Sequence, residues 1–106
     1  MKARRDVYQA IADPTRRAIL ALLISQNMTA GDIASKFDSA RPTISKHIKI
    51  LQESELIESN RMGREIHYKI RVEKMKEVDK WLAPFRKMWE DRFEGLDNLL
   101  DKLKNE

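Results

Sequence analysis

The stretch from Thr29 to Gln52 is the part of the sequence that most restricts the fold. It holds two short amphipathic segments, residues 29–37 and 41–52, separated only by the break "DSAR". In the second segment Ile44, Ile48 and Leu51 recur at helical spacing, and polar side chains occupy the opposite side. Two short helices joined by a tight turn, the second presenting polar residues outward, are typical of a helix-turn-helix.

Two more helices are expected before this pair. Residues 3–12 carry an apolar stripe beside charged residues, and a second helix should run from Pro14 to about Ser25. Asp13 is expected to cap that second helix through its carboxylate. Pro14 fits the first helical position, where its missing N–H costs no hydrogen bond. Arg16 and Arg17 oppose the dipole of the helix they begin, so local stability does not explain them. A pair of phosphates would, and ordinary surface salt bridges are the alternative.

After Leu51 the pattern changes from a helical to an alternating period. The runs Leu56 to Arg61 and Glu65 to Val72 predict a β-hairpin around "RMGR", in which Gly63 supplies the positive φ of a tight turn. One face of the second strand is expected to pack and the other to be wet: Ile66, Tyr68 and Ile70 on the packed face, and His67 among the exposed residues. A hairpin after a helix-turn-helix is a wing.

The last third predicts one long helix or two in series, with apolar residues seven positions apart. The two rows are Met75, Leu82, Trp89, Leu96 and Leu103, and Val78, Phe85 and Leu99. Arg92 interrupts the second row. Pro84 should kink or split the helix, with about 10 residues before it and roughly 20 after it. An apolar stripe of this kind is typical of a helix that packs against a partner helix.

Composition excludes several classes of protein. The chain has no cysteine and only two histidines, His47 and His67, so a disulfide framework, a thiolate site and a structural zinc site are not expected. No nucleophile and base at a recognisable spacing and no glycine-rich phosphate loop are present, which argues against an enzyme. No apolar run has the length of a membrane span and the N-terminus lacks a signal-peptide core, so we expect a cytoplasmic protein. No cofactor is expected.

The basic residues are concentrated in the first two thirds of the chain. Residues 1–72 hold 13 Lys and Arg against 8 Asp and Glu, whereas residues 73–106 hold 8 against 9. The 106 residues are enough for one domain with a modest core, which a partner subunit would help to complete. The excess of basic residues in 1–72 favours an anionic partner for this part of the chain.

Several strings resemble the ArsR family of bacterial winged-helix repressors, in a branch without cysteines. They are "AIADPTRRAILALL" (10–23), "RPTISKHIKILQESELI" (41–57), "RMGREIHYKI" (61–70) and "WLAPFRKMWEDRF" (81–93). The resemblance implies a mainly α fold with a small β-hairpin, in the order α-α-α-α-β-β-α. Residues 1–72 would form the winged helix-turn-helix, and residues 73–106 a dimerisation helix of the same domain.

The same resemblance implies a homodimer, joined by the first and last helices, that binds an inverted-repeat operator in double-stranded DNA. Helix 41–52 would enter the major groove, and wing 61–64 would lie at the backbone or in the minor groove. The expected DNA-binding residues are Arg16, Arg17, Arg41, Thr43, Ser45, Lys46, His47, Lys49, Arg61 and Arg64. The expected dimer interface consists of Val7, Tyr8, Ile11, Trp81, Leu82, Phe85, Trp89, Phe93, Leu96, Leu99 and Leu103.

Two departures from the family bear on these expectations. The chain lacks the cysteines of the family's metal sensors, and it has no histidine beyond His67, so no metal site is expected. Ala40 stands where relatives often place a serine cap, a role that Ser39 could take over. Alternatives are a protein-interaction module built on the C-terminal stripe, or a metal-responsive repressor with an unrecognised site. The sequence does not say whether a small-molecule or protein effector acts on the chain.

Overall fold

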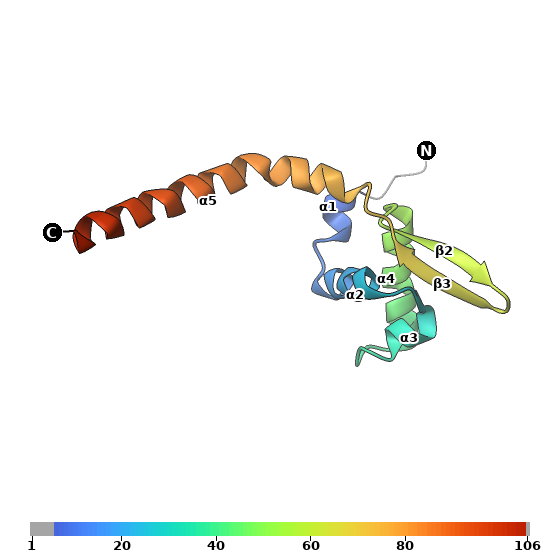
Figure 1. Cartoon of the computed structure of the whole chain (residues 1–106). Helices are drawn as coiled ribbons and strands as arrows, with labels where there is room; N and C mark the ends of the chain where they lie inside the picture. Colours follow the sequence, from blue (N-terminus) through green and yellow to red (C-terminus); the bar gives the residue numbers. More distant parts are fainter. Residues whose placement is uncertain (1–5, 106) are drawn as a thin grey trace. The chain divides into compact units, whose positions relative to one another are not determined.

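The computed structural model describes residues 6–105 and divides into two compact units, with the boundary between Lys76 and Glu77. The elements, labelled in Figure 1, are α1 (Val7–Ala10), α2 (Pro14–Ser25), β1 (Met28–Thr29), α3 (Ala30–Ala34), α4 (Arg41–Glu53), β2 (Ile57–Met62), β3 (Glu65–Ile70) and α5 (Met75–Lys104). The first unit therefore contains the expected helices, turn and hairpin, and the winged helix-turn-helix fold is confirmed.

The core of the first unit is formed by α2, α3, α4 and the start of β2. Its fully buried large side chains are Ile19, Leu23, Ile33, Ile44, Leu51, Leu56 and Ile57. The helical spacing in α4 thus places its isoleucines and leucine inward, as expected. Ala34 and Phe37, on the apolar side of the first segment of the pair, are only half-buried.

Side-chain caps fix where two of the helices begin. The backbone N–H of Arg16 donates to Asp13 Oδ2 at 3.0 Å, so the predicted Asp13 cap is confirmed. The backbone N–H of Asp32 donates to Thr29 Oγ1 at 3.1 Å, which caps α3 in the same way. α4 differs, because its N-cap is Ala40 and no side chain caps it. The expectation that Ser39 replaces the missing serine was wrong.

α1 is shorter than predicted. Of the expected range 3–12, residues 3–5 lie outside the described part of the chain, and the helix ends at Ala10. Asp13 precedes a proline and is extended, with φ −94° and ψ 130°, which is incompatible with a continuing helix. The same residue therefore keeps α1 from continuing into α2 and caps α2.

The sheet has three strands in the order β1-β3-β2, not the two that were predicted. β1 is two residues long, too short to show a period in sequence, and it pairs antiparallel with β3 at Met28–Tyr68 and Thr29–His67. β2 and β3 form the predicted antiparallel hairpin, in which Gly63 has φ +66°. The glycine was therefore placed correctly in the turn.

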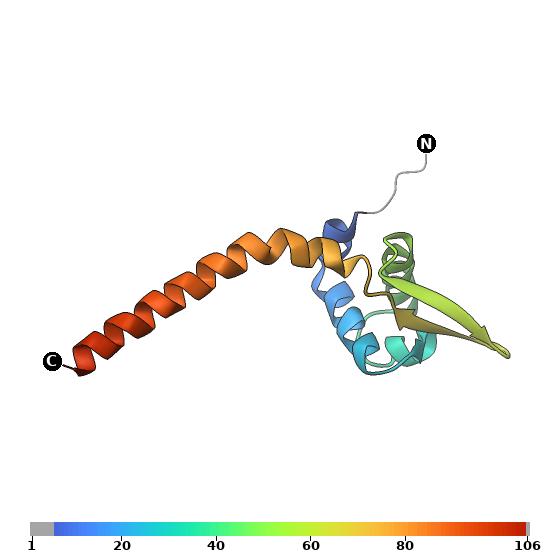
Figure 2. The same ribbon diagram turned by 45° about the horizontal axis from the view of Figure 1, so that its top comes forward.

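The predicted alternation of buried and exposed residues in β3 was wrong. Ile66 is 48% exposed, whereas His67 is half-buried and its Nε2 lies 3.5 Å from Glu65 Oε1. Exposure falls along β3 from its start to its end instead of alternating between faces. Figure 2 shows the reason: the tip of the β2–β3 hairpin projects beyond the helices, so both faces of the tip meet water.

α5 is one helix of 30 residues that continues through Pro84. Of the two expected effects of Pro84, a kink or a split, the split does not occur. Figure 2 shows an unbroken ribbon that bends in its first half. Pro84 and Lys80 are both exposed, so water can satisfy the Lys80 carbonyl that proline leaves without an intrahelical partner. None of the helices within residues 6–105 is long and apolar enough to cross a membrane.

Candidate nucleic-acid interface

The outward face of α4 is polar, cationic and accessible. Thr43, Ser45, Lys46 and Lys49 are all exposed, and the buried residues of the same helix occupy the other side. Within the described part of the chain, Lys46 and Lys49 form no ion pair or hydrogen bond. Arg41 is also exposed, and its guanidinium lies over α3, 3.6 Å from where a Cβ on Gly31 would stand. Ammonium and hydroxyl groups left free in this way can donate to base edges or phosphates.

The wing tip carries two further exposed cations, Arg61 and Arg64. Arg61 Nε donates to the Gly63 carbonyl at 3.3 Å, which ties that side chain to the turn. Nearer the base of the hairpin, Lys69 pairs with Glu58 at 3.0 Å, so that cation is already neutralised. The free positive charge of the wing is thus concentrated at its tip.

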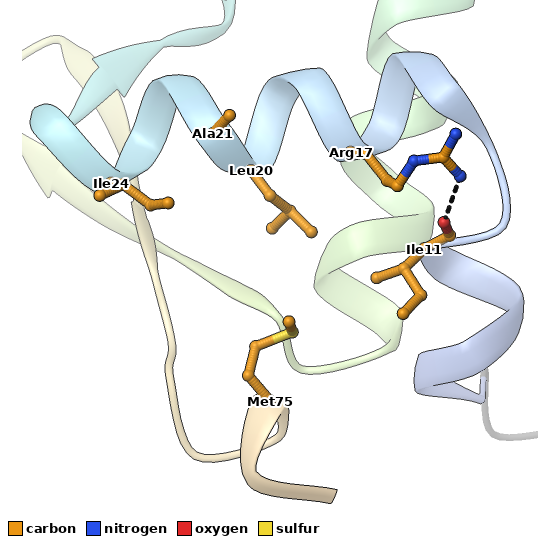
Figure 3. A pocket seen from close by; sticks show the side chains of 6 residues that line it. All are labelled: Ile11, Arg17, Leu20, Ala21, Ile24 and Met75. Carbon is orange, nitrogen blue, oxygen red and sulfur yellow. Dashed lines mark hydrogen bonds between the residues drawn. The ribbon is translucent and has the colours of Figure 1, made fainter. Parts of the chain in front are cut away.

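Arg16 and Arg17 have structural partners that the sequence did not suggest. Arg16 donates from Nε to the Ala10 carbonyl at 2.7 Å and from Nη2 to the Gln9 carbonyl at 3.1 Å. Arg17 donates from Nη1 to the Ile11 carbonyl at 2.8 Å (Figure 3). These carbonyls lie at the C-terminal end of α1, where the helix itself supplies no further N–H. The Gln9 carbonyl also accepts from the backbone N–H of Ala12 at 3.2 Å. Both arginines therefore stabilise the junction of α1 and α2, contrary to what their place against the helix dipole suggested.

His47 is turned towards α2 and is not part of the exposed face of α4. Its side chain is 16% exposed, and Arg16 Nη1 donates to its Nδ1 at 3.2 Å. Because a guanidinium can only donate, Nδ1 accepts, and in the neutral ring the proton is on Nε2. Nε2 in turn lies 4.0 Å from Asp13 Oδ2. Arg16, His47 and Asp13 thus form a cluster that joins α1, α2 and α4.

The cluster affects the acidity of Asp13. The hydrogen bond from the backbone N–H of Arg16 lowers the pKa of the Asp13 carboxyl below its usual value of 3.8. The charge of Arg16 acts in the same direction, as does that of His47 when its ring is protonated. Partial burial opposes the shift but does not reverse it. Asp13 therefore stays ionised in mild acid.

An apolar hollow of about 250 Å³ lies in the first unit beside these groups. Figure 3 shows its lining residues Ile11, Arg17, Leu20, Ala21, Ile24 and Met75. Ile24 is 73% exposed although it is apolar. Among residues 6–105 no group of three or more acidic or histidine side chains could hold a metal ion.

The residues expected in a dimer interface differ in accessibility. Val7 is buried within its own chain, whereas Tyr8 is 38% exposed and Ile11 is half-buried. On α5 only Leu82 is half-buried, and the other expected residues are exposed: Trp81, Phe85, Trp89, Phe93, Leu96, Leu99 and Leu103. The stripe of α5 thus presents a continuous apolar surface, and Val7 has little surface to offer a partner.

A helix-turn-helix with an exposed cationic second helix and a cationic wing defines a winged-helix DNA-binding regulator. Comparisons with known proteins agree. Residues 11–60 match the helix-turn-helix domain family. The transcriptional repressor SdpR of Bacillus subtilis is 42% identical over 80 residues, which are 76% of this chain and 89% of SdpR.

Similar solved structures indicate the family to which the chain belongs. The crystal structure of an ArsR family transcriptional regulator superposes with a TM-score of 0.68 at 40% identity, covering 78% of this chain and 86% of that one. A homodimeric winged helix-turn-helix DNA-binding domain, Mb0332 from Mycobacterium bovis, superposes with a TM-score of 0.58 at 25% identity, covering 83% and 79%. The chain belongs to the ArsR family of winged helix-turn-helix proteins. It is a DNA-binding transcriptional regulator and not an enzyme.

Proposed function

We propose that the chain is a repressor that binds an inverted-repeat operator as a homodimer, with α4 in the major groove and the wing tip at the backbone or in the minor groove. The observation that carries the proposal is the exposed face of α4, where Lys46 and Lys49 have no partner within the described chain. Thr43 and Ser45 add hydroxyl groups to the same face. The repressor activity named for the 42% identical relative supports the direction of regulation.

A second copy of the chain is the proposed partner of the α5 stripe. Exposed apolar side chains along some twenty residues of one helix would be unfavourable in water unless another surface covers them. The charges of α5 suit an antiparallel pair. Residues 75–89 hold four Lys and Arg against two Asp and Glu, whereas residues 90–104 hold three against five. Antiparallel helices would therefore place opposite net charges across the interface, and parallel helices would oppose like charges.

The dimer fixes a geometric requirement for the operator. Two recognition helices related by a two-fold axis reach successive major grooves on one side of the duplex, so the half-sites should lie about one helical turn, roughly 10 bp, apart. Selection of bound DNA from a random library would identify the operator. A selected site without two-fold symmetry would contradict the dimeric proposal.

The variant Lys46→Ala/Lys49→Ala tests the proposed recognition helix. Each lost base contact should cost about 1–3 kcal/mol, so operator affinity should fall at least tenfold while the chain remains dimeric. Binding is measured by fluorescence anisotropy with the selected operator. The matched control, Lys102→Ala/Lys104→Ala, removes the same charge from the last turn of α5 and should bind much more tightly than the α4 variant. Equal affinity of the α4 variant and the parent would contradict the assignment.

A further inference from the structure

We infer that Arg16 positions the recognition helix instead of contacting a phosphate: it ties α4 to the end of α1 and the start of α2. The inference rests on the proposed function of α4 as the DNA-reading helix. It gives Arg16 a different part in recognition from the phosphate contact that the sequence suggested.

The hydrogen bonds of Arg16 carry the inference. All three guanidinium nitrogens are engaged, Nε and Nη2 with the carbonyls of Ala10 and Gln9 and Nη1 with Nδ1 of His47. The backbone N–H of the same residue is held by Asp13. The planar guanidinium belongs to α2 and is fixed in a single orientation by its bonds to α1 and α4. Three of its five N–H groups are thereby used within the chain, and their bonds fix where the other two point.

The bond to His47 restrains a motion that apolar packing restrains poorly. α4 is otherwise held to the core mainly by Ile44, Ile48 and Leu51, whose contacts are non-directional and tolerate a small rotation or slide. A hydrogen bond depends on direction as well as distance. Because His47 directly follows Lys46, a rotation that breaks the bond also moves the groove-facing lysine.

Arg17 provides a matched comparison within the same helix turn. It also donates to a carbonyl at the end of α1, that of Ile11 at 2.8 Å, but among residues 6–105 it forms no hydrogen bond to α4, and it is more exposed than Arg16. Replacing either arginine by glutamine removes one positive charge and weakens the end of α1. Only replacement of Arg16 also removes the link to the recognition helix.

The dependence of operator affinity on salt separates the two roles. A phosphate contact releases counterions, and its loss reduces the slope of log K against log salt concentration by about 0.9. Arg16→Gln should weaken operator binding about tenfold, with the slope unchanged and with little effect on an unrelated duplex. Arg17→Gln, if Arg17 contacts a phosphate, should weaken binding to both duplexes and reduce the slope. Lys104→Gln controls for net charge alone.

Two outcomes for Arg16→Gln would overturn the inference. One is a slope reduced by about 0.9 with equal losses on both duplexes, which identifies a phosphate contact. The other is unchanged operator affinity. If the parent protein itself binds no operator, the proposed function fails, and this result is distinct from either of the two.

Variants of His47 test the same link without disturbing the bonds of Arg16 to α1. His47→Leu removes the acceptor and should reproduce the loss of operator affinity, whereas His47→Asn offers an oxygen near the position of Nδ1 and should restore part of it. The double variant Arg16→Gln/His47→Leu should bind no more weakly than the worse single variant, because both remove one interaction. Circular dichroism melts establish that each variant is folded at the binding temperature. Fully additive losses would overturn the inference, even if Arg16→Gln alone does not fold.

Discussion

At the scale of single residues, Arg16 joins three helices through contacts with residues that lie far apart in the sequence. Its backbone N–H is held by the Asp13 cap, a short-range bond that the sequence predicted. The partners of Arg16 depend on where α1 ends and on how α4 packs, so no local pattern could identify them. A hint was present nonetheless: arginines that oppose the dipole of their own helix need an acceptor elsewhere.

Asp13 gives a prediction about acid stability. Its pKa is lower in the folded chain than its usual 3.8, mainly through the hydrogen bond from the backbone N–H of Arg16. The unfolded chain therefore binds the proton more readily, so the stabilisation is fully present above the unfolded pKa and is lost as the pH falls through the folded pKa. Asp13→Asn keeps a capping oxygen but does not titrate. Its free energy of unfolding should depend less steeply on pH below about pH 4 than that of the parent.

Urea unfolding followed by circular dichroism at a series of acidic pH values measures this difference. Asp13→Ala serves as the control for the cap itself, because it should lose about 1 kcal/mol at neutral pH, where Asp13→Asn loses little. Parallel pH profiles for the parent and Asp13→Asn would show that the carboxylate makes no such contribution.

At the scale of elements, the order of helices and strands was predicted, and the errors have physical causes. β1 was missed because two residues carry no periodicity, and it exists only because β3 offers an edge to pair with. Alternation in β3 failed because a projecting hairpin has no covered face near its tip, as Ile66 shows. Pro84 did not end α5, since the affected turn faces water.

The turn of the wing gives a prediction at this scale. Gly63 has φ +66°, a conformation that other residues adopt at a cost of about 1–2 kcal/mol, although a Cβ there would meet open space. Gly63→Ala should therefore lower the free energy of unfolding by about 1 kcal/mol through backbone strain alone. Gly31→Ala is the matched control, because a Cβ at Gly31 would make only ordinary contacts and its φ is not strained. Thermal melts compare the two, and equal melting temperatures would contradict this account.

At the scale of the whole molecule, the two ends of the chain carry different chemistry. The cationic face of α4 belongs to the first unit, and the apolar stripe of α5 to the second. The sequence predicted both surfaces from periodicity, since each is a helix with one distinct face. It could not establish the pairing of two chains, because an exposed stripe is compatible with any apolar partner. The homodimer and its direction therefore remain a prediction.

The absence of cysteine allows a direct test of the antiparallel pair. In an antiparallel dimer of identical helices, a residue meets its own copy only near the two-fold axis, which for the stripe from Trp81 to Leu103 should lie near Arg92. Single cysteines introduced along α5 should therefore form disulfide-linked dimers most readily in the middle and poorly at Leu82 or Leu103. Mixing Leu82→Cys with Leu103→Cys chains should restore cross-linking, because antiparallel helices place these two positions side by side. Non-reducing gels measure the linked fraction. Efficient self-linking at every position would indicate parallel helices, and linking at none would indicate that another surface covers the stripe.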